Sequence, residues 1–396
     1  MINVQTLKGF RDFLPKDAKK REYVVNTLKA VFESYGFEPL ETPALEYEEI
    51  LTGKYGEEGD KLMYKFEDNG KRKVALRYDQ TVPLARVIAQ YQNDLPMPFK
   101  RYQIQNVWRA ENTQKGRYRE FMQCDIDTAG SPSLRADAEI IACALECIKK
   151  LGFKNVKVFI NDRSIFNKLK PGYVSAIDKL EKIGKENVAK ELVKKGMDKA
   201  DAEKLINSFN DNKPAANVLT LFEDLEKLGF EKNKDFVFKA SLARGLNYYT
   251  STIFEIVSDD YPYGSLAGGG RYDNLIGIFS GKPIPAVGIS FGFDRVIEAM
   301  EELGLFPAGL SVTKVLVTNT NEKEALKTAK TLRENNINTE VYLDEKDLEK
   351  QLKYADKKDI PFSIIFDKEK LILKDMIRRT QETLTLEEII KKLNIS

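Results

Sequence analysis

The most regular pattern of polar and apolar residues lies within residues 99–130. Two runs of alternating side chains flank a short polar loop, which predicts a β-hairpin. In the second run the odd positions from Arg117 to Asp127 are polar apart from Phe121, and the even positions are mostly bulky or apolar. Arginine side chains suit bidentate binding of phosphate, and a nearby carboxylate can hold an amino group. The hairpin is therefore either a site for a nucleotide and an amino acid or an exposed strand pair with solvated charges.

Other periodicities predict the elements around this hairpin. A helical period predicts helices over residues 17–35, 81–92 and 133–151, and an apolar run predicts a strand over 156–161. Residues from about 166 to 235 are rich in lysine and glutamate with helical spacing, which predicts a helical insertion. From residue 312, strands alternate with helices, which predicts a small α/β domain with a mostly parallel sheet. The chain is thus expected to be α+β, with a larger domain over 1–311 and a smaller one over 312–396.

Composition limits the cellular setting. The chain has 396 residues, 42% of them hydrophobic and 31% charged, which indicates a globular protein of two or three domains. It contains no apolar run long enough to cross a membrane, and its first residues lack the apolar core of a signal peptide, so a cytoplasmic location is expected. Its three cysteines match neither a disulfide framework nor a zinc site, and are expected to be buried thiols. The net charge is 63 − 61 = +2, so any nucleic-acid binding must use local patches.

The chain contains no histidine. This excludes an imidazole general base, histidine-containing catalytic triads and zinc sites that use histidine. Chemistry must therefore use carboxylates, arginines, backbone groups or groups of the substrate. Activation of a carboxylate by ATP meets this condition, since the protein need supply only orientation and charge stabilisation. A need to synthesise this protein during histidine shortage would explain the missing histidines. Compositional drift or engineering would explain them equally well.

Four short motifs follow one another in a fixed order: RAENTQKGRYREF from Arg109, QCDID from Gln123, RGLNYY from Arg244 and GGGRYD from Gly268. The last lies within residues 267–273, where three consecutive glycines predict a loop. This ordered set resembles class II aminoacyl-tRNA synthetases, and histidyl-tRNA synthetases in particular. Residues 286–300 resemble motif 3 of that class, and Pro43 matches the proline of motif 1.

The resemblance implies an antiparallel-sheet catalytic core with a helical insertion, followed by a C-terminal α/β anticodon-binding domain. It implies an ATP-dependent aminoacyl-tRNA ligase that forms histidyl-adenylate and transfers histidine to the 3′ end of tRNA(His). ATP would be accompanied by Mg²⁺, and the motif 1 resemblance implies a homodimer. No membrane association is expected.

The same resemblance assigns roles to matching positions. The expected catalytic residues are Arg109 and Arg244. The expected histidine-binding residues are Asp79, Thr81, Gln123, Asp127, Tyr248, Tyr249 and Tyr272. The expected ATP-binding residues are Arg109, Glu111, Arg117, Arg119, Phe121 and Arg295. The hairpin loop residues Gln114 and Lys115 are expected to approach the tRNA acceptor end, and no side chain is assigned to a metal.

The sequence departs from the family pattern at a few positions. Asn247 replaces the usual aspartate, Ser251 replaces a common glycine, and Asp294 stands where glutamate is commoner. Asp79 matches the family branch with the shorter acid rather than the branch with glutamate.

Other functions remain open from the sequence. The main alternative is a non-catalytic, histidine-binding regulatory subunit of ATP phosphoribosyltransferase, a paralogue that typically lacks the terminal domain and has a degraded ATP site. Retention of residues 312–394 and of arginines at the ATP face argues against it. The synthetase-like region of a stress kinase is disfavoured because no kinase segment is present, and another class IIa synthetase is disfavoured by RGLNYY.

Overall fold

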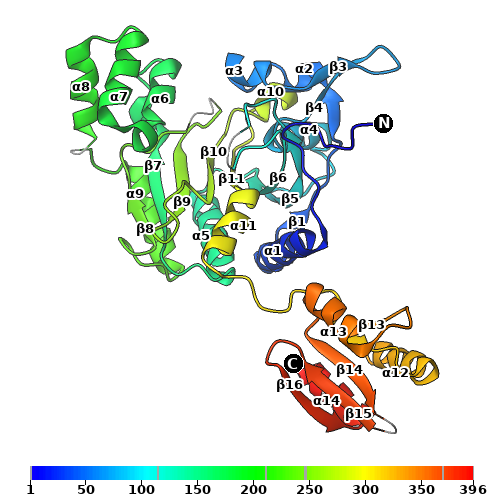
Figure 1. Cartoon of the computed structure of the whole chain (residues 1–396). Helices are drawn as coiled ribbons and strands as arrows, with labels where there is room; N and C mark the ends of the chain where they lie inside the picture. The colour runs from blue at the N-terminus through cyan, green and yellow to red at the C-terminus, as the bar shows by residue number, and fades with distance from the viewer. Residues whose placement is uncertain (1, 114–115, 210–211, 245–247, 368–369, 396) are drawn as a thin grey trace. The chain divides into compact units, whose positions relative to one another are not determined.

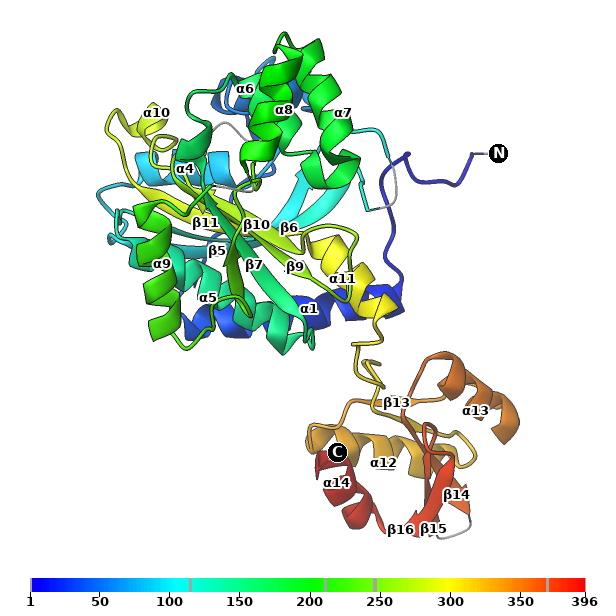
Figure 2. The same ribbon diagram turned by 90° about the vertical axis from the view of Figure 1, so that its left-hand side faces the viewer.

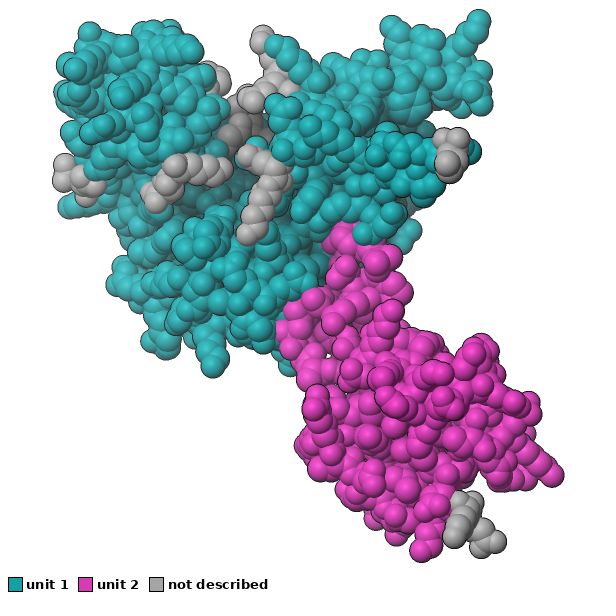
Figure 3. Space-filling model, in the orientation of Figure 1, with its two compact units in different colours: residues 1–12, 24–305 teal, residues 13–23, 306–396 magenta. Residues whose placement is uncertain are grey.

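The computed structural model describes residues 2–113, 116–209, 212–244, 248–367 and 370–395. The chain forms two compact units, which are coloured separately in Figure 3. The first contains residues 1–12 and 24–305, and the second contains residues 13–23 and 306–396. The domain boundary expected from the sequence, between residues 311 and 312, stays a prediction. Within the described ranges, no helix is both long and apolar enough to cross a bilayer.

An eight-stranded sheet forms the centre of the described part of the first unit (Figure 1). Its strands lie in the order β1-β5-β6-β11-β10-β9-β7-β8. Neighbours run antiparallel, except that β1 is parallel to β5 and β8 is parallel to β7. The antiparallel core is therefore confirmed. The strands are β1 (Glu38–Pro39), β5 (Phe99–Trp108), β6 (Glu120–Ala129), β7 (Val156–Asp162), β8 (Phe236–Phe238), β9 (Thr252–Ser258), β10 (Ala267–Arg271) and β11 (Ala286–Phe291).

Two long helices cover one face of this sheet, as Figure 2 shows. Helix α1 (Pro15–Ser34) places Phe32 with its ring centroid 5.7 Å from that of Tyr102 on β5 and 5.8 Å from that of Phe291 on β11. Helix α5 (Leu134–Lys150) packs against β6, β7 and β11 and buries an almost continuous apolar surface. Both helices confirm their sequence prediction within two residues at each end. The opposite face of the sheet is left for the polar side chains of β6.

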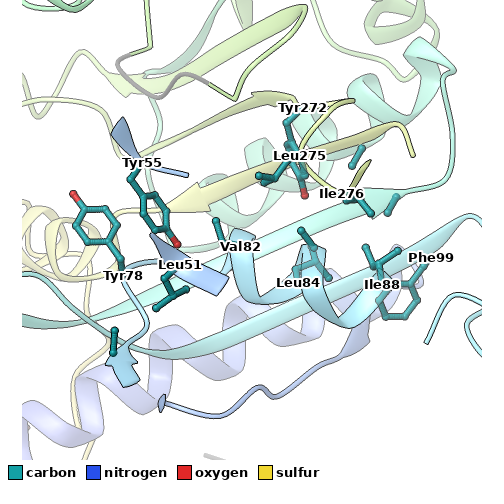
Figure 4. Close-up of a cluster of buried hydrophobic side chains, with 14 of the residues drawn as sticks. Leu51, Tyr55, Tyr78, Val82, Leu84, Ile88, Phe99, Tyr272, Leu275 and Ile276 are labelled. Atoms are coloured by element: carbon teal, nitrogen blue, oxygen red, sulfur yellow. The ribbon is translucent and has the colours of Figure 1, made fainter. Parts of the chain in front are cut away.

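A hydrophobic cluster fixes helix α4 (Thr81–Gln90) beside the large sheet. Val82, Leu84 and Ile88 of this helix are fully buried in the cluster, together with Phe99 and Leu275 (Figure 4). A small sheet joins the same region, with β4 (Lys73–Leu76) between β2 (Leu45–Tyr47) and β3 (Lys65–Glu67). Short helices nearby are α2 (Glu48–Leu51), α3 (Gly56–Lys61) and α10 (Gly277–Ser280). The cluster holds the start of α4, and with it Asp79, in place over the sheet.

The prediction of a glycine loop over residues 267–273 is wrong for its glycines, because Ala267–Arg271 form β10 between β9 and β11. A β-carbon on Gly269 would lie 2.0 Å from the carbonyl oxygen of Gly288, and one on Gly268 would lie 2.1 Å from a guanidinium nitrogen of Arg244. Neighbouring groups therefore occupy the space of the missing side chains. The glycines are needed for close packing within a strand.

Helices fill the predicted insertion between β7 and β8. They are η1 (Arg163–Phe166), α6 (Pro171–Ile177), α7 (Leu180–Lys194), α8 (Lys199–Ser208) and α9 (Ala216–Lys227). The first three α-helices share their own buried cluster, which includes Tyr173, Val188, Leu192 and Ile206. Helix α9 instead packs against α5. The last helix of the first unit is α11 (Phe293–Glu302), which follows β11 directly.

The second unit contains a five-stranded sheet among its described residues, in the order β13-β12-β14-β15-β16. The pairs that β12 forms with β13 and β14 are parallel, but the pairs that β15 forms with β14 and β16 are antiparallel. The sheet is thus half parallel, and the expectation of a mostly parallel sheet is wrong. Its elements are β12 (Val315–Val317), α12 (Glu322–Glu334), β13 (Thr339–Val341), α13 (Leu348–Lys357), β14 (Phe362–Asp367), β15 (Lys370–Asp375), β16 (Thr380–Leu384) and α14 (Leu386–Ile395).

Candidate functional site

A cavity of about 470 Å³ lies on the face of the large sheet opposite α1 and α5, within the first unit. Its lining comes from β6, β9, β10 and β11, from the start of α4 and from the start of α11. The sequence-predicted residues that line it are Asp79, Thr81, Arg109, Glu111, Arg117, Phe121, Gln123, Asp127, Arg244, Tyr248, Tyr249, Tyr272 and Arg295. The structure therefore brings together residues that are as far as 216 positions apart (295 − 79) around one cavity.

The central feature of this wall is a buried ion pair between β5 and β6. Arg101 is fully buried, and its Nη2 lies 2.8 Å from Oδ2 of Asp127. The two residues are direct cross-strand neighbours, and Gly288 is the neighbour of Asp127 on β11. A β-carbon at Gly288 would lie 1.9 Å from Oδ1 of Asp127, so only glycine leaves room for the carboxylate. Burial raises the pKa of Asp127, and the positive charge of Arg101 opposes this rise.

Asp79 lies at the opposite side of the cavity, directly before α4. Its Oδ1 accepts a 2.8 Å hydrogen bond from the Tyr55 hydroxyl and a 3.1 Å bond from the backbone N–H of Val82. Burial raises the pKa of Asp79, although these two hydrogen bonds and the charge of Arg109 lower it. The carboxylate is fixed by the helix start and is stabilised by nearby donors.

Three tyrosines form the aromatic part of the wall. The ring centroid of Tyr248 lies 4.8 Å from that of Tyr249 and 5.9 Å from that of Tyr272. The hydroxyl of Tyr272 donates a hydrogen bond to Asp127, which links the aromatic rings to the buried ion pair. A planar ligand with an N–H at its edge fits such a wall. Its ring can stack on the tyrosines while the carboxylate of Asp127 accepts a hydrogen bond from the N–H.

Arginines and one phenylalanine make up the other end of the cavity. The Nε of Arg109 donates a 3.0 Å hydrogen bond to the carbonyl oxygen of Tyr78, and its guanidinium carbon lies 5.1 Å from the ring centroid of Phe121. Arg295, in the first turn of α11, donates a 2.7 Å hydrogen bond to the carbonyl oxygen of Ser265. Arg117 lies 3.5 Å from Glu111 and is half exposed. Several guanidinium groups beside an aromatic face suit a base and its phosphates.

Arg244 lines the same cavity. Its Nη1 forms a 2.7 Å ion pair with Glu255 of β9, and its backbone carbonyl accepts a 2.9 Å hydrogen bond from Arg163. The guanidinium occupies the space above Gly268, where a β-carbon would collide with it. The rest of the arginine stays available to a ligand in the cavity, whose lining includes it.

Comparisons with known proteins agree with this geometry. The sequence model described as histidyl-tRNA synthetase matches residues 9–296, and the one described as anticodon binding domain matches residues 312–394. The histidine–tRNA ligase of Christiangramia forsetii is 41% identical, over 92% of each chain. The chain belongs to the histidyl-tRNA synthetase family.

Solved structures support this family assignment. The histidyl-tRNA synthetase from Nostoc sp. PCC 7120 is 31% identical, with a TM-score of 0.86 over 100% of both chains. A protein from Bacillus halodurans described as an ATP phosphoribosyltransferase regulatory subunit/histidyl-tRNA synthetase is 24% identical, with a TM-score of 0.67 over 87% of this chain and 93% of its own. The second similarity establishes the shared fold only.

Some residues that the family resemblance predicted do not join the cavity. Arg119 is absent from its described lining, and its Nε donates a 3.2 Å hydrogen bond to the carbonyl oxygen of Glu111. Its backbone N–H donates a 2.9 Å bond to Gly9, whose missing β-carbon leaves room for the Arg119 side chain. Gln114 and Lys115 lie outside the described residues.

The departures from the family pattern have local explanations where the structure describes them. The Ser251 hydroxyl donates a 3.0 Å hydrogen bond to Asp162 and accepts a 3.0 Å bond from Asn217, and so joins β9 to the insertion. Asp294 forms a 3.0 Å ion pair with Arg11 of the N-terminal segment. Asn247 lies outside the described residues.

Four acidic lining residues were not assigned to the site from the sequence, and Glu255 and Asp125 are the two that bear on its chemistry. Glu255 orients Arg244, and Asp125 lies between Gln123 and Asp127 on β6. The alternation of the hairpin already placed Asp125 on the polar face, and this was the signal that could have identified it. No pattern in the sequence marked Glu255, because its contact with Arg244 depends on the glycines of the neighbouring strand β10.

Replacing Arg101 with methionine tests the buried ion pair. The Arg101→Met variant leaves Asp127 without its cation, and we expect a loss of about 3–5 kcal/mol in the free energy of unfolding at pH 8. Arg101 lowers the pKa of Asp127 against the effect of burial, so removing Arg101 raises that pKa further, and ionising Asp127 as the pH rises costs the variant more stability than the unaltered protein. The loss measured by urea unfolding should therefore be smaller at pH 5 than at pH 8.

The matched control is Arg135→Met, which removes an exposed arginine at the start of α5 and should change stability little at either pH. Equal losses at pH 5 and pH 8 for Arg101→Met would contradict the assigned electrostatic role.

Proposed function

We propose that the protein activates histidine with ATP and transfers it to the 3′ end of tRNA(His). The observation that carries this proposal is that Arg244 lines one cavity together with a carboxylate-rich wall and an arginine-rich wall. The first wall suits the amino group and ring of an amino acid, and the second suits a nucleotide. Family membership names the amino acid as histidine, since the curated relative is a histidine–tRNA ligase.

Histidine is proposed to bind along β6 and the tyrosines. Asp79, Thr81 and Gln123 would receive its α-amino group. Asp127, whose carboxylate is already fixed by Arg101, would accept a hydrogen bond from an N–H of the imidazole ring. The rings of the three tyrosines at the cavity, Tyr248, Tyr249 and Tyr272, would enclose the imidazole.

ATP is proposed to bind at the arginine-rich end, with its adenine against Phe121. The residues proposed to contact its phosphates are Arg109, Glu111, Arg117 and Arg295, and a role of Arg119 in ATP binding stays a prediction. Mg²⁺ bound to substrate phosphates needs only one or two protein carboxylates, and Glu111 at this end of the cavity fits that requirement. The described residues contain no cluster of three or more metal-ligating side chains. Mg²⁺ would neutralise charge on the polyphosphate.

In the first step a carboxylate oxygen of histidine attacks the α-phosphorus of ATP. A new oxygen–phosphorus bond forms as the bond to the pyrophosphate leaving group breaks. Arg244 can donate hydrogen bonds both to the attacking carboxylate and to the α-phosphate, where negative charge develops. Its ion pair with Glu255 would hold it in this orientation before the substrates arrive. In the second step a hydroxyl of the terminal ribose of tRNA attacks the histidyl carbonyl and releases AMP.

Transfer to tRNA is proposed to involve both units. The second unit matches the anticodon binding domain, and Gln114 and Lys115 are proposed to approach the acceptor end. A homodimer is also proposed, because the small sheet exposes the apolar side chains of Leu45, Tyr47 and Phe66. A cytoplasmic location fits the three cysteines, which are buried and free.

Charging of tRNA tests the proposed function. With ATP and Mg²⁺, the purified protein should attach radiolabelled histidine to tRNA(His), and should attach none of the other amino acids. Attachment of a different amino acid would contradict the assignment of the substrate. Histidine binding without charging of tRNA would favour the regulatory paralogue.

Replacing Arg244 with alanine tests the proposed catalytic residue. Loss of a donor to charge that develops in the transition state should lower the rate of adenylate formation about 10²- to 10³-fold. Single-turnover formation of adenylate, measured with saturating substrates, separates this loss from weaker binding. Arg135→Ala is the control and should keep the original rate. A near-normal rate in Arg244→Ala would contradict the assignment.

A further inference from the structure

Asp125 is a buried carboxylate at the cavity to which the site described above gives no role. It lies on β6 between Gln123 and Asp127, and its side chain faces the cavity as theirs do. Its cross-strand neighbours are Gln103 on β5 and Ser290 on β11. The residue is 3% exposed, so a ligand in the cavity could reach it while bulk water is largely excluded.

One oxygen of Asp125 is unsatisfied. The carboxylate makes a hydrogen bond with Ser290, whose hydroxyl oxygen also accepts a 3.1 Å bond from Nε2 of Gln123. Among the described residues, however, neither Oδ1 of Asp125 nor Oε1 of Gln123 has a hydrogen-bond partner. Buried acceptors are rarely left unpaired, because the cost of removing them from water is not recovered. Two neighbouring unpaired acceptors at a cavity therefore indicate a ligand that donates hydrogen bonds.

The charges around Asp125 also favour a cation. The guanidinium of Arg101 forms its 2.8 Å ion pair with Asp127 rather than with Asp125. Burial raises the pKa of Asp125 to about 7; Arg101 lowers it, whereas Asp127 and Asp79 raise it. Burial and the neighbouring carboxylates of Asp127 and Asp79 thus disfavour the charged form of Asp125, and a positively charged ligand would stabilise it.

The position of Asp125 and Gln123 indicates which group of the ligand they bind, an ammonium or an imidazole. The side chain of Gln80 donates to the carbonyl oxygen of Gln123 at 3.3 Å, which places the turn that carries Asp79 over the Gln123 end of β6. Tyr272 donates its hydrogen bond to Asp127, two residues beyond Asp125 on β6. Asp79 raises the pKa of Asp125, so these two carboxylates lie near each other in the cavity. An ammonium has three N–H donors and can be shared among these acceptors.

Arg244 supplies the matching group for the carboxylate of the same ligand. Asp125, Ser290 and Gly268 are consecutive cross-strand neighbours on β6, β11 and β10, and Arg244 lies over Gly268. Two strand spacings are about 10 Å, a span that an amino acid's ammonium and carboxylate can bridge with one hydrogen bond at each side. Asp125 at one side and Arg244 at the other therefore match the ammonium and the carboxylate of a zwitterionic amino acid.

We infer that Asp125 binds the α-ammonium group of the amino-acid substrate, together with Asp79 and Gln123. This inference rests on the proposed function and adds a substrate-binding residue to it. Oδ1 of Asp125 accepts no hydrogen bond from the residues that the structure describes, and an N–H of the substrate would donate one to it. The same contact discriminates against ligands that have the ring but no amino group.

Two histidine analogues test this inference directly. Histidinol keeps the amino group and the ring, and imidazole-4-propionate keeps the ring and the carboxylate but has no amino group. In Asp125→Asn, the Kd of histidinol measured by calorimetry should rise about 10- to 100-fold, the usual effect of losing a hydrogen bond between charged groups. The Kd of imidazole-4-propionate should stay unchanged. The contrasting variant Asp127→Asn, which alters the ring contact, should weaken both analogues.

Equal weakening of both analogues by Asp125→Asn would overturn the inference, and so would unchanged binding of both. If the unaltered protein binds neither histidine nor histidinol, the proposed function fails as well. If it binds them and Asp125→Asn does not discriminate, only the inference about Asp125 fails.

A measurement on the unaltered protein keeps the test independent of any folding defect in the variant. The ratio of histidinol affinity to imidazole-4-propionate affinity should rise from pH 6 to pH 8 as Asp125 ionises, since its pKa is raised to about 7. The ring pKa values of the two ligands differ, because the ammonium of histidinol lowers its ring pKa and the carboxylate of imidazole-4-propionate raises the other. Each affinity is therefore corrected for the fraction of neutral ring, measured by titrating the free ligand. Asp125 is surrounded by Arg101, Asp127, Asp79 and Cys124, so the same ratio is also measured in Asp125→Asn, where its rise should be absent. A ratio that does not change with pH in the unaltered protein would contradict the inference.

Discussion

The cavity depends on the fully buried ion pair between Arg101 and Asp127. A carboxylate in this position would otherwise be protonated, because ionising it without a counter-charge costs too much inside the protein. With Arg101 beside it, Asp127 can accept a hydrogen bond from Tyr272 and hold the aromatic wall in place. Gly288 leaves the space that this arrangement occupies. The pair is therefore the fixed reference for the amino-acid end of the site.

A second constraint places the reactive end. Strand β10 is glycine-rich because the backbone of Gly288 and the guanidinium of Arg244 fill the space of side chains at 269 and 268. Since Glu255 on the next strand binds Arg244, the sheet itself orients this arginine. Such preorganisation removes the need to arrange charges during the reaction. The glycines of β10 thus allow both the close packing of the backbone and the placement of Arg244, which stabilises charge.

The sequence predicts the parts of the site that depend on local order. The period-2 pattern of residues 99–130 gives the hairpin, and the apolar stripes give α1 and α5, because each pattern has one stable arrangement against a core. It fails at β10, since consecutive glycines carry no strand signal, and at the polar strand β16. It also cannot place Arg119, whose direction depends on a long-range contact with Gly9. Family resemblance names the substrate, which no pattern in the residues gives, and burial and register then add Asp125.

The central claim is that one cavity brings the carboxylate of histidine and the α-phosphate of ATP together at Arg244. The most direct test is exchange of radiolabelled pyrophosphate into ATP, measured with each amino acid in turn and without tRNA. The account predicts exchange with histidine only, because adenylate formation is reversible and needs only this cavity. No exchange with histidine, from a protein that binds both histidine and ATP, would contradict it.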